Sequence, residues 1–163
     1  MLFRSHISKT IERIKGRDVV LVAQDTMELS YADHPATRNL GPTSGPGGWG
    51  KHVHSSFAVS MDGVPLGLIA QRSWARDVQS QGKRHQRRKK ATSEKESQRW
   101  LDAQEQIQER VGPHCRTVTL ADREADIFDL FVMDRPESND LLIRGTHNRQ
   151  RSEEHTSELQ SPN

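Results

Sequence analysis

The sequence contains little cysteine, few aromatic residues and no long apolar run. Cys115 is the single cysteine among 163 residues, which excludes an intramolecular disulfide and suits a reducing compartment. No stretch approaches the run of about 18 apolar residues that a membrane-spanning helix needs, and the first residues lack the apolar core and cleavage site of a secretory signal. We therefore expect a cytoplasmic protein, neither membrane-bound nor rich in disulfides.

The apolar content is low as well. Hydrophobic residues make up 32% of the chain, aromatic residues 5%, and the mean hydropathy is −0.85, so we expect one domain with a small core.

The net charge is +2. Residues 151–163 hold one arginine and three glutamates, a net −2, so residues 1–150 carry +4. This mild basic excess suits a polyanionic partner.

Three segments are distinguished along the chain. Residues 1–17 predict a short leader helix, the remnant of an upstream region, with isoleucines along one side and Gly16 at its end. Residues 18–150 form the main domain. Residues 151–163, RSEEHTSELQSPN, have no apolar periodicity and resemble the translation of a sequencing-library adapter. We expect a non-native or disordered tail there and exclude it from fold reasoning.

Asp122 stands where a predicted strand becomes a helix. The stretch RTVTLAD, residues 116–122, alternates and is rich in β-branched residues, as a strand should be. From Arg123 onward the residues favour a helix, with Ala125 and Phe128 at helical spacing. A lone aspartate at such a point is commonly a helix cap. Functional groups also collect where the strands of an open α/β sheet end.

A second apolar run ends on an aspartate. The stretch VVLVAQDTMEL, residues 19–29, predicts a strand that stops at Asp25, and its unbroken apolar start suggests burial on both faces. If this strand lies parallel to the one that ends at Asp122, the strand ends are about 4.8 Å apart. Two carboxylates at that separation repel each other unless a cation lies between them. Mg²⁺ and Mn²⁺ prefer such oxygen ligands, so a divalent-metal site at these aspartates is predicted.

The remaining pattern completes an α/β order. Strands over 52–60 and 64–74 are joined by an Asp-Gly turn that is typical of hairpins, after a glycine-rich loop over 31–51. A capping-box pair, Ser93 and Glu96, opens a helix that Gly112-Pro113 ends. Residues 140–145 give a fifth strand. The predicted order is β-β-β-α-β-α-β, in which long crossovers make strands one, four and five parallel.

Two further groups of residues have more than one interpretation. His52 and His54 lie on one face of a strand, where a zinc site could begin. Neither a cysteine nor a third histidine stands nearby, so we favour a polar patch near nucleic acid. The basic run within 75–92 is either a solvated loop or a surface that neutralises phosphates. Its candidate DNA contacts are Lys83, Arg84, Arg87 and Arg88.

Five stretches resemble, in order and spacing, the DDE transposases of bacterial insertion sequences, in the branch of the IS-four elements and the Tn-five transposase. The match runs from about Asp18 to Arg149. The stretches are QDTMEL (24–29), GWGKHVHSSFAVSMDGVPLGLIAQRSWARD (48–77), EKESQRWL (94–101), DREADIFDL (122–130) and LLIRGTHNR (141–149).

The resemblance implies an RNase H-like catalytic core that lacks its final helix. Asp25 would be the first catalytic carboxylate, bridging two Mg²⁺ or Mn²⁺ ions, and Asp122 would be the second, binding one of them. Arg144 and His147 would contact DNA near the active site. Members of the family cleave and join phosphodiesters at element ends and act as dimers on paired DNA ends, so DNA and a second copy of the full-length protein are expected partners.

The resemblance also implies a third carboxylate, a glutamate in a Tyr-Arg-Glu-Lys signature that this sequence lacks. The tail glutamates Glu153, Glu154 and Glu158 do not match it. We therefore expect this chain, as a fragment, to be inactive in strand cleavage. Two alternatives stay open: a non-catalytic DNA-binding module of the same fold, and a zinc-dependent hydrolase that uses His52 and His54.

Overall fold

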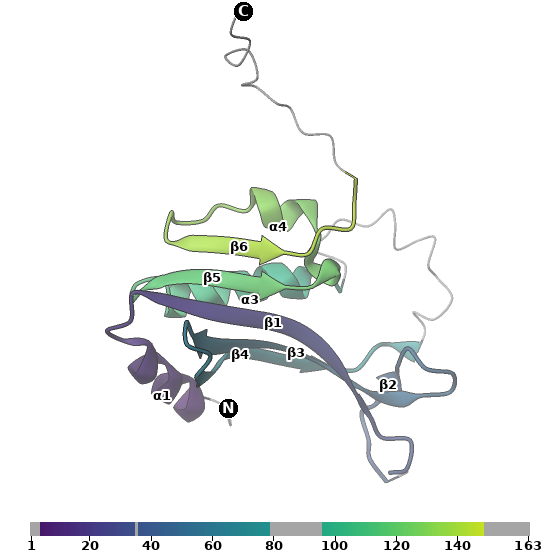
Figure 1. Ribbon diagram of the computed structural model, residues 1–163. Helices are drawn as coiled ribbons and strands as arrows, with labels where there is room; N and C mark the ends of the chain where they lie inside the picture. Colours follow the sequence, from purple (N-terminus) through teal and green to yellow (C-terminus); the bar gives the residue numbers. More distant parts are fainter. Residues whose placement is uncertain (1–3, 35, 79–95, 149–163) are drawn as a thin grey trace, which may run out of the picture.

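The computed structural model describes residues 4–34, 36–78 and 96–148. This part of the chain is an α/β fold built on one mixed sheet of six strands (Figure 1). Within it, no helix is long and apolar enough to cross a membrane. The predicted tail and four predicted DNA-contacting residues lie outside the described ranges: Lys83, Arg84, Arg87 and Arg88.

The sheet combines parallel and antiparallel pairing. Its strands are β1 (Val19–Ser30), β2 (Gly41–Pro42), β3 (Trp49–Ser60), β4 (Pro65–Trp74), β5 (Arg116–Ala121) and β6 (Asn139–Ile143). β3 pairs in antiparallel with β1 and β4, and β2 joins its start. β5 pairs in parallel with both β1 and β6. The predicted parallel set is thus confirmed, and from β1 onward the longer elements follow the predicted order.

The hairpin of β3 and β4 forms where the Asp-Gly pair predicted it. Gly63 takes a φ of +83°, a left-handed conformation that glycine adopts without steric cost. The prediction of a continuous loop over 31–51 is wrong, because this stretch contains β2 and the start of β3. Gly50 permits that pairing, since a Cβ atom there would collide with the Leu29 carbonyl oxygen.

β1 differs from its prediction in length and in burial. It continues through Asp25 to Ser30, because β3 still pairs with it after its parallel partner β5 has ended. Burial on both faces is also wrong. Val20 and Val22 are fully buried, whereas Ala23 on the opposite face is exposed.

Two helices cover the face that carries Val20 and Val22. They are α1 (Arg4–Ile14) and α3 (Gln98–Arg110). Ile14 and Ile107 pack with the two valines in one hydrophobic core. The predicted leader helix therefore contributes its apolar side directly to the core of the main sheet. Trp100 of α3 belongs to a second cluster, with Ala125 and Leu130.

The start of α3 was predicted too early. A capping box requires the Glu96 side chain to reach back toward the preceding turn, but its carboxylate instead accepts two hydrogen bonds from Arg76, at 2.6 and 2.8 Å. The helix begins at Gln98. Ser93, the other member of the predicted pair, lies outside the described residues.

The helix predicted from Arg123 onward is interrupted. A 3₁₀ turn, η3 (Arg123–Ala125), is followed by the short helix α4 (Phe128–Val132). Asp126 separates them with a non-helical backbone, at a ψ of 66°. Its carboxylate accepts hydrogen bonds from the segment that follows β6, so a tertiary contact has overridden helix propensity here.

Shortening Ile14 to alanine should test whether α1 is part of the core. We expect Ile14→Ala to lower the free energy of unfolding by about 2–4 kcal/mol, because a fully buried side chain is lost and a cavity remains. Ile7→Ala, on the same helix but only partly buried, should cost clearly less. Urea titration of both variants measures this, and equal small losses would show that α1 is dispensable to the fold.

Candidate functional site

β5 and β6 end side by side, at the level where β1 loses its parallel partner, and a charged residue follows on each of the three segments. The last paired residues are Gln24 with Ala121, and Ala121 with Ile143. The next residue of each segment is Asp25, Asp122 and Arg144, and all three are exposed. Asp122 and Arg144 line an open hollow of about 550 Å³ between the ends of β5 and β6. The predicted adjacency of the two aspartates is therefore present in the structure.

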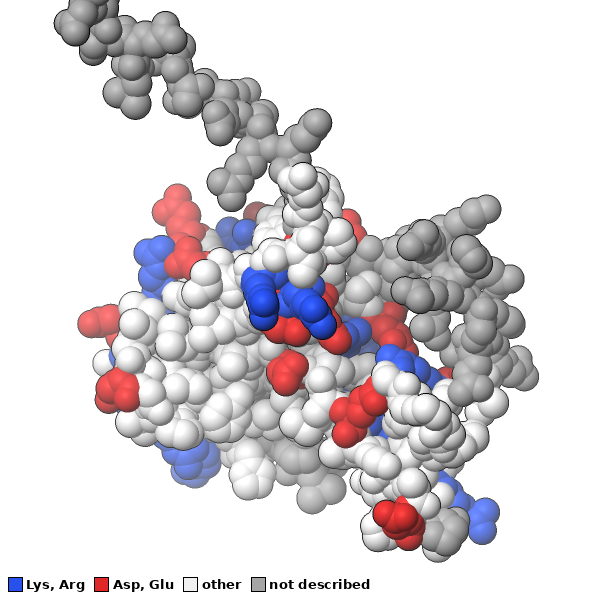
Figure 2. All heavy atoms as spheres, turned by 45° about the vertical axis from the view of Figure 1, so that its right-hand side comes forward, with Lys and Arg blue, Asp and Glu red and all other residues white. Residues whose placement is uncertain are grey.

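Figure 2 brings these strand ends toward the viewer. Among the described residues, positive and negative side chains lie next to one another there and form no broad patch of one sign. A phosphate group would meet an arginine beside carboxylates on this face. Such a surface suits a polyanion only where a cation or an arginine offsets the carboxylates.

Each aspartate accepts a backbone hydrogen bond close to its own position. The Thr26 N–H donates to Asp25 Oδ1 at 2.7 Å, and the Glu124 N–H donates to Asp122 Oδ1 at 2.8 Å. Asp122 is thereby the N-cap of η3, as the simpler interpretation of the sequence proposed. A carboxylate has several lone pairs, so capping leaves acceptor capacity for a metal ion.

The donor set at this edge fits a hard divalent cation in part. Mg²⁺ is commonly held by one or two carboxylates, with water and phosphate oxygens completing its shell, and Asp25 and Asp122 supply two such groups. Within residues 4–34, 36–78 and 96–148, however, no cluster of three or more His, Cys, Asp or Glu side chains could enclose a metal ion. The structure thus offers two carboxylates in place of a complete protein-made cage.

The segment after β6 is held by Asp126. This buried carboxylate accepts the Thr146 N–H at 2.6 Å and the His147 N–H at 2.8 Å, and His147 Nδ1 lies 3.0 Å from it. The His147 side chain is 67% exposed. Arg144 is tied in turn to β5, because its N–H donates to the Ala121 carbonyl at 3.1 Å. Arg144 and His147, two of the predicted DNA contacts, thus lie on a segment that hydrogen bonds join to β5 and to Asp126.

His52 and His54 are not an accessible polar patch, and that prediction is wrong. Each is only 2% exposed. His52 stacks on Trp74 with ring centroids 5.4 Å apart, and His54 meets Trp100 edge-on at 4.5 Å. The sheet face that carries them is the one that α3 covers, which the hairpin pattern alone does not reveal.

A chain of buried hydrogen bonds runs behind the two aspartates. Thr26 Oγ1 lies 2.8 Å from His54 Nδ1, and His54 Nε2 lies 3.2 Å from Gln24 Oε1. Gln24 Nε2 donates to Gln104 Oε1 at 3.2 Å, and that oxygen also accepts from Thr119 Oγ1 at 2.9 Å. These bonds all form if His54 is neutral, accepts at Nδ1 and donates from Nε2.

Burial keeps His54 neutral. Removal from water, with a smaller contribution from the positive charge of Arg99, lowers the pKa of His54 to about 4. The imidazole therefore stays uncharged at neutral pH. Its Nδ1 can then accept a hydrogen bond from the hydroxyl of Thr26, the residue that follows Asp25.

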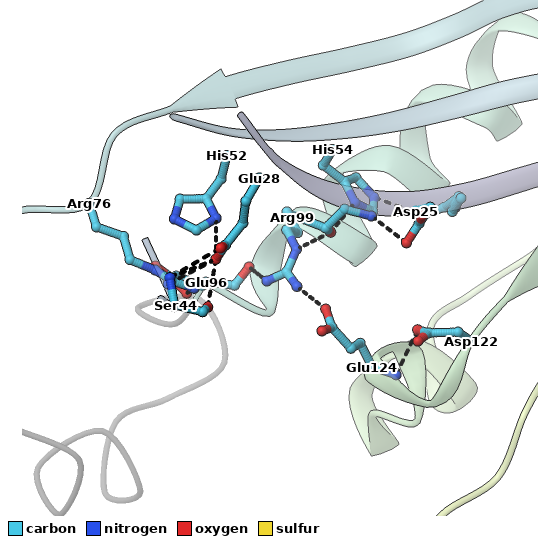
Figure 3. A network of polar contacts seen from close by, with 12 residues as sticks. Asp25, Glu28, Ser44, His52, His54, Arg76, Glu96, Arg99, Asp122 and Glu124 are labelled. Atoms are coloured by element: carbon cyan, nitrogen blue, oxygen red, sulfur yellow. Dashed lines mark hydrogen bonds and ion pairs between the residues drawn. The ribbon is translucent and has the colours of Figure 1, made fainter. Parts of the chain in front are cut away.

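A second set of charges lies farther along β1 (Figure 3). Glu28 accepts from the Ser44 hydroxyl at 2.6 Å, which lowers the pKa of Glu28. His52 Nδ1 and Arg76 Nη1 approach the same carboxylate at 3.5 and 3.6 Å. Glu96 completes the set through Arg76. Arg76 thus lies between the Glu28 and Glu96 carboxylates, and the bond from Ser44 to Glu28 anchors the loop that contains Ser44.

Two residues near the aspartates were not predicted as functional. Arg99 of α3 donates to Thr26 Oγ1 at 2.9 Å and to Glu124 Oε2 at 2.8 Å. The second residue is Glu124. Arg99 and Glu124 lie in the stretches EKESQRWL and DREADIFDL, but only the tertiary structure shows that they are in contact.

A scan against protein-family models found no matching family, and a search of curated proteins found no significant relative.

Stability should fall as the pH decreases from about 6.5 to about 4. The pKa of His54 is lowered in the folded protein, so the folded state favours neutral imidazole and loses stability once the unfolded chain begins to bind a proton. The loss should reach at most about 3 kcal/mol. Urea titrations at several pH values measure it. His54→Gln should flatten this part of the profile, whereas exposed His6→Gln should not; identical profiles for all three proteins would contradict the assignment.

Proposed function

We propose that this chain is the RNase H-like core of a DDE transposase of bacterial insertion sequences. Its function would be metal-dependent phosphodiester cleavage and strand transfer at element ends. The observation that supports this best is the register of β1 and β5, in which exposed Asp25 and Asp122 directly follow paired residues of two parallel strands. The resemblance names the same two residues as catalytic carboxylates.

The remaining features of the edge agree with a phosphodiester substrate. Arg144 lies beside Asp122 on the hollow between β5 and β6, where its guanidinium can bind a phosphate oxygen through charge-assisted hydrogen bonds. His147 lies three residues farther on, held by Asp126. The two residues would position the DNA backbone, whereas the aspartates would hold Mg²⁺ or Mn²⁺.

The bound cations would activate the attacking oxygen and stabilise the leaving oxygen. The chain's own part is to present two carboxylates at fixed places and to bind the phosphate beside them. The third carboxylate that the resemblance implies has no match in this sequence. We therefore propose that the chain as given binds Mn²⁺ and DNA without robust strand cleavage, and that the full-length protein acts as a dimer in the bacterial cytoplasm.

Titration with Mn²⁺ tests the shared carboxylate site. The concentration of free Mn²⁺ is measured at each step by electron paramagnetic resonance. We expect the wild-type chain to bind Mn²⁺, and Asp25→Asn or Asp122→Asn to weaken binding at least about tenfold, because each removes a charged ligand. Asparagine keeps the cap at position 122, so the fold should persist. Asp62→Asn, the same change in the turn between β3 and β4, is the matched control. Equal affinities in all four proteins would refute the site.

One observation favours a second candidate, a non-catalytic DNA-binding module of the same fold. Asp122 already serves as the cap of η3, which gives this residue a structural role without any metal. In that case DNA binding should be salt-sensitive and independent of both Mn²⁺ and Asp25.

Fluorescence anisotropy with a DNA duplex separates the two candidates. For the transposase core, we expect Mn²⁺ to tighten DNA binding in the wild type and not in Asp25→Asn. Arg144→Ala should weaken binding under both hypotheses and reduce the salt slope by about one. A DNA affinity that changes neither with Mn²⁺ nor with Asp25→Asn would favour the non-catalytic module.

A further inference from the structure

The Arg99 side chain joins the two segments that carry the aspartates. Its Nε donates to Thr26 Oγ1 at 2.9 Å, and its Nη2 donates to Glu124 Oε2 at 2.8 Å. Thr26 adjoins Asp25 in β1, and Glu124 lies two residues after Asp122. Figure 3 shows the guanidinium between the two segments, with Asp25 and Asp122 beyond it.

The same two residues provide the backbone hydrogen bonds that orient the carboxylates. The Thr26 N–H binds Asp25 Oδ1, and the Glu124 N–H binds Asp122 Oδ1. One planar guanidinium therefore connects to both carboxylates through one intervening residue each. Because its N–H groups have a fixed arrangement, the guanidinium restricts the relative positions of these residues.

Arg99 is itself held from several sides. Its side chain is only 12% exposed, and its guanidinium carbon lies 5.8 Å from the Trp74 ring centroid and 5.5 Å from that of Trp100, within the range of cation–π attraction. Its Nη1 also donates to the Glu96 carbonyl at 2.7 Å. An arginine buried and bonded in this way can act as a fixed spacer.

We propose that Arg99 is a positioning residue that sets the relative placement of Asp25 and Asp122. It touches neither carboxylate and acts through Thr26 and Glu124. This inference rests on the proposed function for the role of the aspartates, but the positioning itself concerns the protein alone and can be measured without metal or DNA.

A purely structural role is the competing explanation, in which Arg99 only fastens α3 to the sheet. The chain offers a matched control for that role. Arg72 of β4, whose side chain is 59% exposed, binds Asp102 of the same helix at 2.8 Å, so Arg72→Gln also removes an arginine contact between α3 and the sheet, but one that involves neither Thr26 nor Glu124. Arg99→Lys keeps the charge near the tryptophan rings and removes the planar fork.

Amide hydrogen exchange, measured by NMR on the metal-free chain, tests the positioning. We expect Arg99→Gln and Arg99→Lys to speed exchange of both the Thr26 and Glu124 amides about tenfold, with core amides such as those of Val22 and Val118 unchanged. Arg72→Gln should leave the two site amides at wild-type rates. Wild-type rates at these amides in both Arg99 variants, or uniform acceleration across β1 and β5, would overturn the proposal.

Titration with Mn²⁺ alone links the positioning to the site. Both Arg99 variants should weaken Mn²⁺ binding about tenfold, and Arg72→Gln should not. If Mn²⁺ binds the wild type and both Arg99 variants equally, the positioning role is refuted. If Mn²⁺ does not bind the wild type while the two amides respond as expected, the positioning stands and the proposed metal function fails.

Discussion

The parallel pairing of β1 with β5 is the constraint on which the rest of the site depends. Val20 and Val22 must point into the core under α1 and α3, and this orientation sets the register of β1. A shift by one residue would bury Asp25 and expose the valines, at a cost of several kcal/mol for an unpaired buried charge alone. The hydrophobic core thus determines where the aspartates emerge.

Hydrogen bonds between buried polar side chains further fix the position of β1 near Asp25. The buried chain from Thr26 through His54 to Gln104 occupies the covered face of the sheet directly behind Asp25. Buried polar networks of this kind stabilise a unique arrangement only when their members are paired. Neutral His54 makes two of the hydrogen bonds in this network, to Thr26 and to Gln24.

Local sequence signals predicted the strands, the hairpin and the order of the elements. Alternation in 116–122 and the Asp-Gly turn depend on residues close in sequence, and the structure confirms both. The adjacency of Asp25 and Asp122 followed from one assumption, parallel pairing, which also holds. The end of β5 could be located from its alternation, whereas β1 continues past Asp25 because β3 still pairs with it.

The failures share a different cause, contacts between residues far apart in sequence. Glu96 was predicted to cap α3 but pairs with Arg76, and Asp126 was predicted within a helix but binds the segment after β6. His54 was expected at the surface because a strand pattern does not say which face a helix will cover. Arg99 was overlooked because its partners, Thr26 and Glu124, are separated from it by tens of residues.

The central claim is that Asp25 and Asp122 together form a cation site at the ends of β1 and β5. The most direct measurement is an anomalous difference map from a crystal of this chain grown with Mn²⁺. If the two aspartates share a cation, the map should show a peak within coordination distance of both carboxylates. A map with no peak there, or with Mn²⁺ bound only at Glu28 and His52, would contradict it.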